Sequence, residues 1–144
     1  MPQDYIIDDT WYEVKTVSSS RTEVSISSIE QLDCVKPGEL VVIRADKTSA
    51  TNANAVNLNM LYKDLLAMLP DDDSREEFST MLLQYGYYPR AEYEGEEYTF
   101  EIKAMARYAV SVDFPCIRRA NLPESITEAK YSLALAAIDS YRKE

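Results

Sequence analysis

Asp4, Glu13 and Lys15 are the residues of this chain whose types and spacing are best suited to chemistry. Two extended segments rich in β-branched and aromatic residues flank Asp8-Asp9, which indicates a β-hairpin with a two-residue turn. That turn sets Asp4 opposite Glu13, and directly opposed side chains lie on one side of a sheet with Cβ atoms about 4.5–5.5 Å apart. Lys15 shares that side because side chains alternate along a strand. We therefore expect the three charged groups on one patch.

Two opposed carboxylates repel each other, and a sheet gains nothing from placing them together. A divalent cation between them reverses the sign of that interaction. The two carboxylates, the backbone carbonyl of Val14 and water form a hard-oxygen site suited to Mg²⁺ or Mn²⁺. Lys15 beside such an ion would orient a water or neutralise charge in a phosphoryl-transfer transition state. The alternative is a solvated hairpin that carries a surface Glu–Lys pair.

The composition excludes several other kinds of site. The chain has no histidine, so catalysis by a histidine base is impossible within it, and its two cysteines lack the spacing of a zinc cluster. The net charge is −10, with nine acidic and two basic side chains in residues 71–97, which argues against general attraction to nucleic acid. No signal peptide or membrane span is evident, so we expect a cytoplasmic protein with no membrane partner.

Local basic side chains remain available for phosphate contacts. Four of them surround the proposed patch in the sequence, and two adjacent arginines follow a later Phe-Pro segment. The candidates are Arg21, Lys36, Arg44, Lys47, Arg118 and Arg119. Taken singly, each of the first four is better explained as an ordinary surface base, and Arg118-Arg119 is as good a candidate for phosphate contact as they are.

The patterns along the chain favour one domain over residues 1–144, with a strand-rich part at 1–46 and a helical pair plus C-terminal strands at 54–144. Strands are expected over residues 3–7, 10–17, 23–27, 39–44, 98–112 and 130–136. A helix is expected to start near Ser27, because Ser27 with Glu30 and Ser28 with Gln31 both fit a capping box.

Two further helices are expected in the second part. Leucines recur at helical spacing from Leu58 to Leu69, and Pro70 ends that helix. Ser74 with Glu77 fits another capping box, and Gly86 lies where a C-terminal cap belongs.

Asp4 followed by Glu13-Val14-Lys15 resembles the signature of the PD-(D/E)xK nuclease superfamily. The (D/E)xK half is intact, whereas the proline of the PD half is displaced to Pro2. The resemblance extends to one bacterial family of PD-(D/E)xK proteins, often encoded beside restriction or phage-defence genes. It does so through Ile-Ser-Ser-x-x-Gln-Leu at residues 26–32, Phe114-Pro115-x-Ile117, Leu122-Pro123 and Tyr131-Ser132-Leu133.

This resemblance implies an α/β fold: a restriction-endonuclease-like mixed sheet with flanking helices, here with extra C-terminal strands. The superfamily core opens with a helix before the strand that bears the Asp, and only three residues precede Asp4, so that helix is expected to be missing. An exposed apolar sheet face or edge would follow. We therefore expect a homo-oligomer or a protein partner that completes the core.

The predicted function is that of a metal-dependent DNA endonuclease in restriction or phage defence. Asp4 and Glu13 would hold the metal, and Lys15 would position the attacking water. The resemblance adds Gln31 as a minor catalytic candidate, although Gln31 also closes the predicted capping box. Two alternatives are a non-catalytic or partner-completed subunit of a defence complex, and a small acidic antagonist of a nucleic-acid enzyme.

Overall fold

The structure is a computed structural model that describes residues 3–144; Pro2, the displaced proline of the predicted signature, lies outside them. The strands are β1 (Tyr5–Ile7), β2 (Thr10–Val17), β3 (Glu23–Ile26), β4 (Gly38–Lys47), β5 (Ala55–Val56), β6 (Phe100–Val110) and β7 (Tyr131–Ala134). The α-helices are α1 (Leu58–Met68) and α2 (Asp72–Gln84). Short 3-10 helices are η1 (Ile29–Gln31), η2 (Ala91–Glu94), η3 (Glu96–Tyr98), η4 (Arg119–Asn121) and η5 (Leu135–Tyr141).

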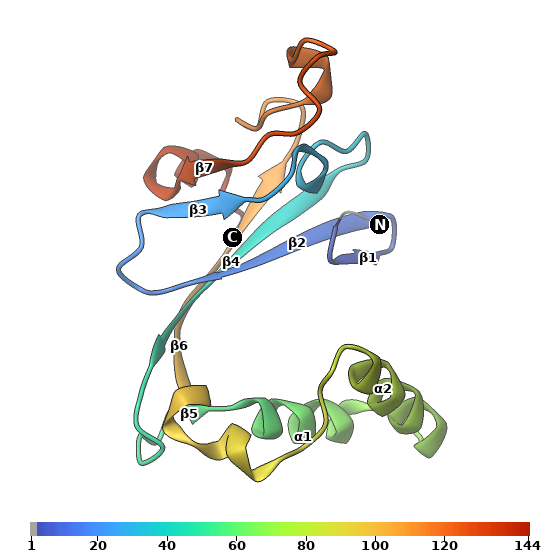
Figure 1. Cartoon of the computed structure of the whole chain (residues 1–144), viewed down its shortest axis with the longest axis vertical. Coiled ribbons are helices and arrows are strands. Elements are labelled where there is room, and N and C mark those ends of the chain that lie inside the picture. The colour runs from blue at the N-terminus through green and yellow to red at the C-terminus, as the bar shows by residue number, and fades with distance from the viewer. Residues whose placement is uncertain (1–2) are drawn as a thin grey trace. The chain divides into compact units, whose positions relative to one another are not determined.

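The strands form a five-stranded sheet of order β1-β2-β4-β6-β5 and a two-stranded sheet of β3 and β7. β1 runs antiparallel to β2, whereas β2 runs parallel to β4, so the larger sheet is mixed (Figure 1). The chain leaves the sheet between β2 and β4 to form β3 and η1. The predicted mixed α/β, restriction-endonuclease-like fold is confirmed.

The chain divides into two compact units. The first unit contains the residues up to Ala45 and Lys103–Glu144, and the second unit contains Asp46–Ile102. We expected the C-terminal strands to group with the helical pair. In the structure, β7 pairs with β3, and most of β6 lies in the first unit, where β4 is its neighbour in the sheet.

The core of the first unit lies between the two sheets. Side chains alternate along β2 and β4, so one face of the larger sheet supplies Trp11, Leu40 and Val42, each at most 2% exposed. They pack in one cluster with residues of β3, β6, β7, η5 and the loops: Val24, Ile26, Leu32, Tyr108, Val110, Phe114, Leu133, Leu135 and Ile138. This core is what holds the N-terminal hairpin in place.

The turn between β1 and β2 is the one predicted from Asp8-Asp9. Both aspartates are in the left-handed region, with φ of 49° and 64°. That pair of angles is the mark of a type I′ turn, whose twist matches the right-handed twist of the strands, and Asp tolerates it better than most residues. The predicted register is confirmed, with Tyr5 opposite Tyr12 and Ile7 opposite Thr10.

The prediction of a helix that starts at Ser27 is wrong, because the structure has only the single turn η1 there. Ser28 precedes η1 but its side chain makes no capping hydrogen bond. The Gln31 side chain, which was expected to complete that capping box, accepts from Ser27 N at 2.9 Å and from Lys15 Nζ at 3.0 Å. The Gln31 side chain therefore combines a local contact with Ser27 and a tertiary contact with Lys15, and no longer helix follows.

The two α-helices lie where they were expected, but the capping of α2 differs from the prediction. Asp71 is its N-cap and accepts from Ser74 N at 2.7 Å, so the predicted Ser74–Glu77 capping box is not formed. The hydrogen bonds from Ser74 hold the pKa of Asp71 below its usual range. Gly86, with φ of 90°, ends the helix as expected, because this left-handed conformation favours glycine.

The second unit is built around aromatic rings rather than a closed core. Tyr62 stacks on Phe78 with ring centroids 6.0 Å apart, and Tyr87 lies 5.6 Å from both Tyr62 and Tyr93. Neither α1 nor α2 has a fully buried residue. Within residues 3–144, neither helix has the length and apolar character needed to cross a membrane.

Replacing Gly38 should destabilise the first unit more than a matched glycine elsewhere. A Cβ at position 38 would lie 1.9 Å from the buried Trp11 ring, so Gly38→Ala should lower the free energy of unfolding by about 1–3 kcal/mol. Gly95→Ala is the control, because its Cβ would meet only Glu92 O at 3.3 Å. Urea unfolding followed by the fluorescence of Trp11, the sole tryptophan, measures both. Equal losses would contradict this account of the packing.

Candidate active site

Glu13 is a buried carboxylate at the centre of the predicted patch. It lies on β2, opposite Leu40 of β4, on the same face of the sheet as Trp11. Trp11 and Glu13 are each 2% exposed. The alternating pattern of the hairpin therefore carries an acidic group to the apolar side of the sheet, where a carboxylate loses its hydration.

Lys15 and Gln31 are the polar neighbours of Glu13. Lys15 Nζ lies 3.2 Å from Glu13 Oε1 and donates a hydrogen bond to Gln31 Oε1 at 3.0 Å. Only 17% of the Lys15 side chain is exposed. Gln31 comes from η1, so the departure of the chain between β2 and β4 is what brings it to this lysine. The structure thus places Glu13, Lys15 and Gln31 together.

Asp4 joins this group from the end of the hairpin. It precedes β1, and its Oδ2 accepts a hydrogen bond from Val14 N at 2.8 Å. Because the N–H and C=O of one strand residue point to the same edge of the strand, the Val14 carbonyl faces the edge on which Asp4 lies. Asp4 and the Val14 carbonyl therefore lie at the same edge of β2, and the charge of Asp4 is close enough to act on Glu13.

The electrostatics of Glu13 are those of a carboxylate that lacks a full set of partners. Burial raises the pKa of Glu13 above its usual value, and the negative charge of Asp4 raises it further, while Lys15 opposes both. Glu13 Oε2 is buried and has no hydrogen-bond partner among the described residues. Buried polar atoms are nearly always paired, so this one calls for an explanation.

Glu39 provides the contrast, because it is equally buried, at 3% exposure, but fully paired. It lies on the opposite face of the sheet, beside Tyr12, and accepts two hydrogen bonds from Arg107 at 2.9 and 2.8 Å. Lys143 also contacts it. The hydrogen bonds from Arg107 and Lys143 lower the pKa of Glu39. Glu39 is thus a structural carboxylate, whereas Glu13 has an oxygen still available.

Gln3 is a buried residue of this site that sequence reasoning missed. Its Nε2 donates to Glu30 O at 2.6 Å and to Gln31 O at 3.4 Å, and the residue is 6% exposed. It ties the segment that carries Asp4 to the turn that carries Gln31. No local signal could reveal this role, because its acceptors are backbone carbonyls 27 and 28 residues away.

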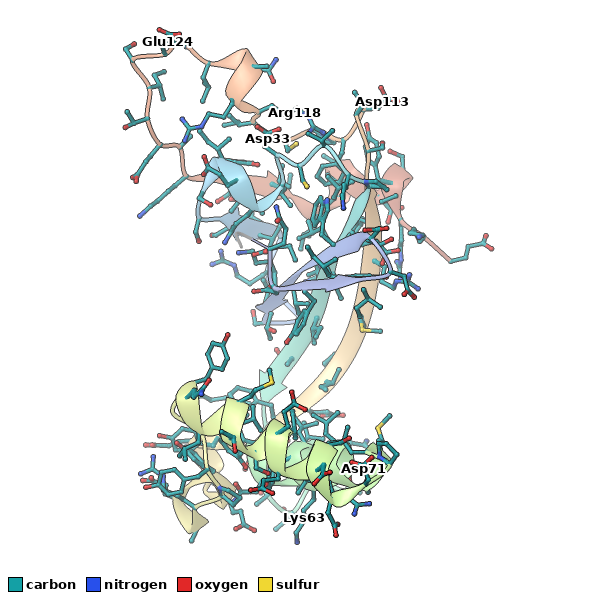
Figure 2. All side chains as sticks on the ribbon, turned by 90° about the vertical axis from the view of Figure 1, so that its right-hand side faces the viewer. Asp33, Lys63, Asp71, Asp113, Arg118 and Glu124 are labelled. Carbon is teal, nitrogen blue, oxygen red and sulfur yellow. The ribbon has the colours of Figure 1, made fainter. Side chains whose placement is uncertain are left out.

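The predicted basic candidates have different surroundings. Arg118 lies 3.6 Å from Asp33, near it in Figure 2, and Arg119 lies 2.6 Å from Glu30, so both anchor the C-terminal segment to the η1 region. Lys36 pairs with Asp9 at 3.1 Å. Lys47 belongs to the second unit.

Arg21 and Arg44 have no such ion pair. Arg44 Nη1 donates to the carbonyls of Ser18, Ser19 and Arg21 at 3.3, 3.1 and 2.7 Å. Arg21 lines a pocket together with Lys15. Among the predicted bases, these two are therefore the ones that lie near the patch without a carboxylate partner in the part of the chain that the structure describes.

The donor set suits a hard cation better than any other group. Residues 3–144 contain no cluster of three or more acidic, thiol or imidazole side chains, so a metal here would rely on two carboxylates and backbone oxygen. Glu13 Oε2 supplies the test of fit, because a cation would satisfy this orphaned acceptor and offset the repulsion from Asp4. Asp4, Glu13 and the Val14 carbonyl therefore fit a divalent ion such as Mg²⁺.

The two buried glutamates should respond oppositely to neutralisation. The pKa of Glu13 is raised in the folded state, so its ionisation lowers the free energy of unfolding as the pH rises above about 4.5. Glu13→Gln should therefore raise the free energy of unfolding by about 1 kcal/mol at pH 7–8. The pKa of Glu39 is lowered in the folded state, so the ionised Glu39 stabilises the fold above about pH 4.5, and this stabilisation is lost on acidification. Glu39→Gln should therefore lose about 1–3 kcal/mol at pH 7 and little at pH 3.

Urea unfolding across pH 3–8 tests both variants, each being the control for the other. A loss of stability in Glu13→Gln as large as that in Glu39→Gln at pH 7 would contradict the partial pairing of the Glu13 carboxylate.

Comparison with known proteins identifies the family of this chain. A family model described as "Putative PD-(D/E)XK family member, (DUF4420)" matches residues 1–136. No curated protein matches the chain significantly, and no solved structure does. Since the match spans nearly the whole sequence, this protein belongs to that PD-(D/E)XK family.

Proposed function

We propose that this chain is a Mg²⁺- or Mn²⁺-dependent endonuclease that hydrolyses phosphodiester bonds of DNA at Asp4, Glu13 and Lys15. The observation that supports it most is the buried Glu13, whose Oε2 has no partner among residues 3–144 and whose pKa is raised. A carboxylate placed this way is of little use to stability, but it is what a cation site needs. Membership in a PD-(D/E)XK family favours a nuclease.

The roles follow from the contacts. Asp4, Glu13 and the Val14 carbonyl would hold the metal, which polarises the scissile phosphate and lowers the pKa of the attacking water. Lys15 has three N–H donors. Glu13 and Gln31 engage two of them, and the third can reach a water or a phosphate oxygen. Gln31 is a positioning residue, because it contacts Lys15 and holds its ammonium next to Glu13.

A partner that completes the fold is proposed on a separate observation. β1 is an outer strand of the sheet, and its three apolar residues are 51–58% exposed. Exposed apolar edge strands are sites at which other chains pair. This favours a homo-oligomer or a partner-completed subunit, in the restriction or phage-defence setting that the family resemblance suggests.

A cleavage assay on supercoiled and linear DNA tests the proposal. With Mg²⁺ or Mn²⁺ the wild-type chain should cut, EDTA should stop it, and Asp4→Ala, Glu13→Ala and Lys15→Ala should each lower the rate by about 10²-fold or more. Glu128→Ala is the matched control, because that acid is exposed in the first unit. Cleavage by Glu13→Ala at the wild-type rate would rule the assignment out.

Metal binding can be tested without any turnover. Mg²⁺ binds the folded state through an ionised Glu13, so the thermal unfolding midpoint of the wild-type chain should rise with Mg²⁺ concentration. Glu13→Gln should show no such rise, whereas Glu128→Gln should behave as wild type. Equal shifts in all three proteins would place the metal elsewhere.

A further inference from the structure

The arginines of this chain divide into two groups by their partners. Five of the eight form an ion pair with an acidic side chain: Arg75, Arg90, Arg107, Arg118 and Arg119. The other three, Arg21, Arg44 and Arg142, have no carboxylate within ion-pair distance among the described residues. In a chain with a net charge of −10, acidic partners are abundant, so this lack of pairing is selective.

The three unpaired arginines line one pocket. It has a volume of about 320 Å³ and lies within the first unit, over β4, β6 and η5. Asp139 is the one acidic residue in its lining, so the pocket wall carries a local excess of positive charge. Basic walls around a concave, partly apolar surface concentrate the field and favour an anion.

Arg44 orders the pocket wall through hydrogen bonds that leave its positive charge without an acidic partner. Its Nη1 donates to three carbonyls of the 18–21 loop, the closest being Arg21 O at 2.7 Å. Carbonyl acceptors fix the position of the guanidinium but do not neutralise it. The same hydrogen bonds hold in place the loop that carries Arg21, so the pocket is preorganised before any ligand arrives.

This pocket shares one lining residue with a pocket beside Lys15. A second pocket of about 410 Å³ is lined by Lys15, Ser18, Ser25 and Arg21, and Arg21 is common to both pockets. In the β2–β4 pairing, Lys15 lies opposite Val42 and Val17 lies opposite Arg44. Arg44 is thus about 7 Å further along the strands than Lys15, a step comparable to that between neighbouring phosphates of a nucleic-acid strand.

We propose that Arg21, Arg44 and Arg142 form a phosphate-binding subsite for the DNA strand whose scissile phosphate lies at Glu13 and Lys15. The DNA strand passes from Lys15 over the serine hydroxyls of the second pocket and reaches the three guanidinium groups. The serine hydroxyls can donate hydrogen bonds to phosphate oxygens. The guanidinium groups bind the sugar-phosphate backbone of the DNA, so they position the DNA strand without reading its sequence. This inference rests on the proposed nuclease function.

A pair of charge-matched double variants tests it. Arg21→Gln combined with Arg142→Gln removes two charges from the subsite and leaves the loop-holding Arg44 in place. Lys63→Gln combined with Lys130→Gln removes the same charge from exposed positions that line neither pocket. Fluorescence anisotropy with labelled single-stranded and duplex DNA, in EDTA to prevent cleavage, measures binding as a function of salt.

The arginine pair should weaken binding by about tenfold or more, and the slope of log K against log salt should fall by about 0.7–0.9 for each phosphate that the variant no longer neutralises. The lysine pair should change binding by less than about twofold, with Trp11 fluorescence confirming that both variants fold. If the arginine pair loses more affinity for single-stranded DNA than for duplex DNA, a single DNA strand enters the pockets. Equal reductions in the two double variants, or no binding by the wild-type chain, would overturn the subsite.

Cleavage separates this inference from the proposed function. If the wild-type chain binds DNA without cutting it, and the arginine pair loses that binding, the subsite stands and the nuclease proposal fails. If the wild-type chain cuts and the arginine pair cuts with unchanged KM, the subsite alone fails. Glu13→Gln should lose cleavage and retain binding in EDTA, because it lies outside both pockets.

Discussion

The burial of Glu13 on the core-facing side of the sheet is the constraint on which the first unit depends. Removing a carboxylate from water costs free energy, and here the cost is only partly offset, since Lys15 reaches one oxygen while the other has no partner among the described residues. The surrounding core must supply the remainder. Trp11, Leu40 and Val42 lie on the same face of β2 and β4 as Glu13, and their burial offsets the cost of a carboxylate oxygen without a partner. Stability and chemistry therefore share one face of the sheet.

The buried glutamates on the two faces of the sheet have different partners and opposite pKa shifts. Glu39, on one face, is clamped by Arg107 and Lys143, and its pKa is lowered. Glu13, on the other, has its pKa raised by burial and by Asp4. The arginines also differ in their partners: five pair with acids, whereas the three that line one pocket of the first unit are held by backbone carbonyls or left exposed. Positive charge without an acidic partner is thus gathered around one pocket of the first unit despite the acidic balance of the chain.

Short-range patterns in the sequence predicted the parts of the structure that are decided locally. The Asp8-Asp9 turn defines the hairpin register, because a type I′ turn permits one alignment of its strands. Alternation along β2 then places Trp11 and Glu13 on one face. The positions of α1 and α2 followed from leucine spacing, Pro70 and Gly86 in the same way. Local reasoning was wrong where a distant partner competed: Gln31 contacts Lys15 rather than capping a helix, and Asp71 caps α2 in place of Ser74.

By itself the sequence determined that an acid pair and a lysine meet at one end of a hairpin, because turn chemistry and strand alternation act over a few residues. It did not contain the fact that Glu13 is buried with a free oxygen, nor that Glu39 is fully paired. Those states depend on partners such as Lys143, which is 104 residues from Glu39 along the chain. Such pairings form only when packing overcomes the entropy of closing long loops, so the order of the residues does not reveal them. The tertiary structure alone decided which charges are satisfied and which remain available.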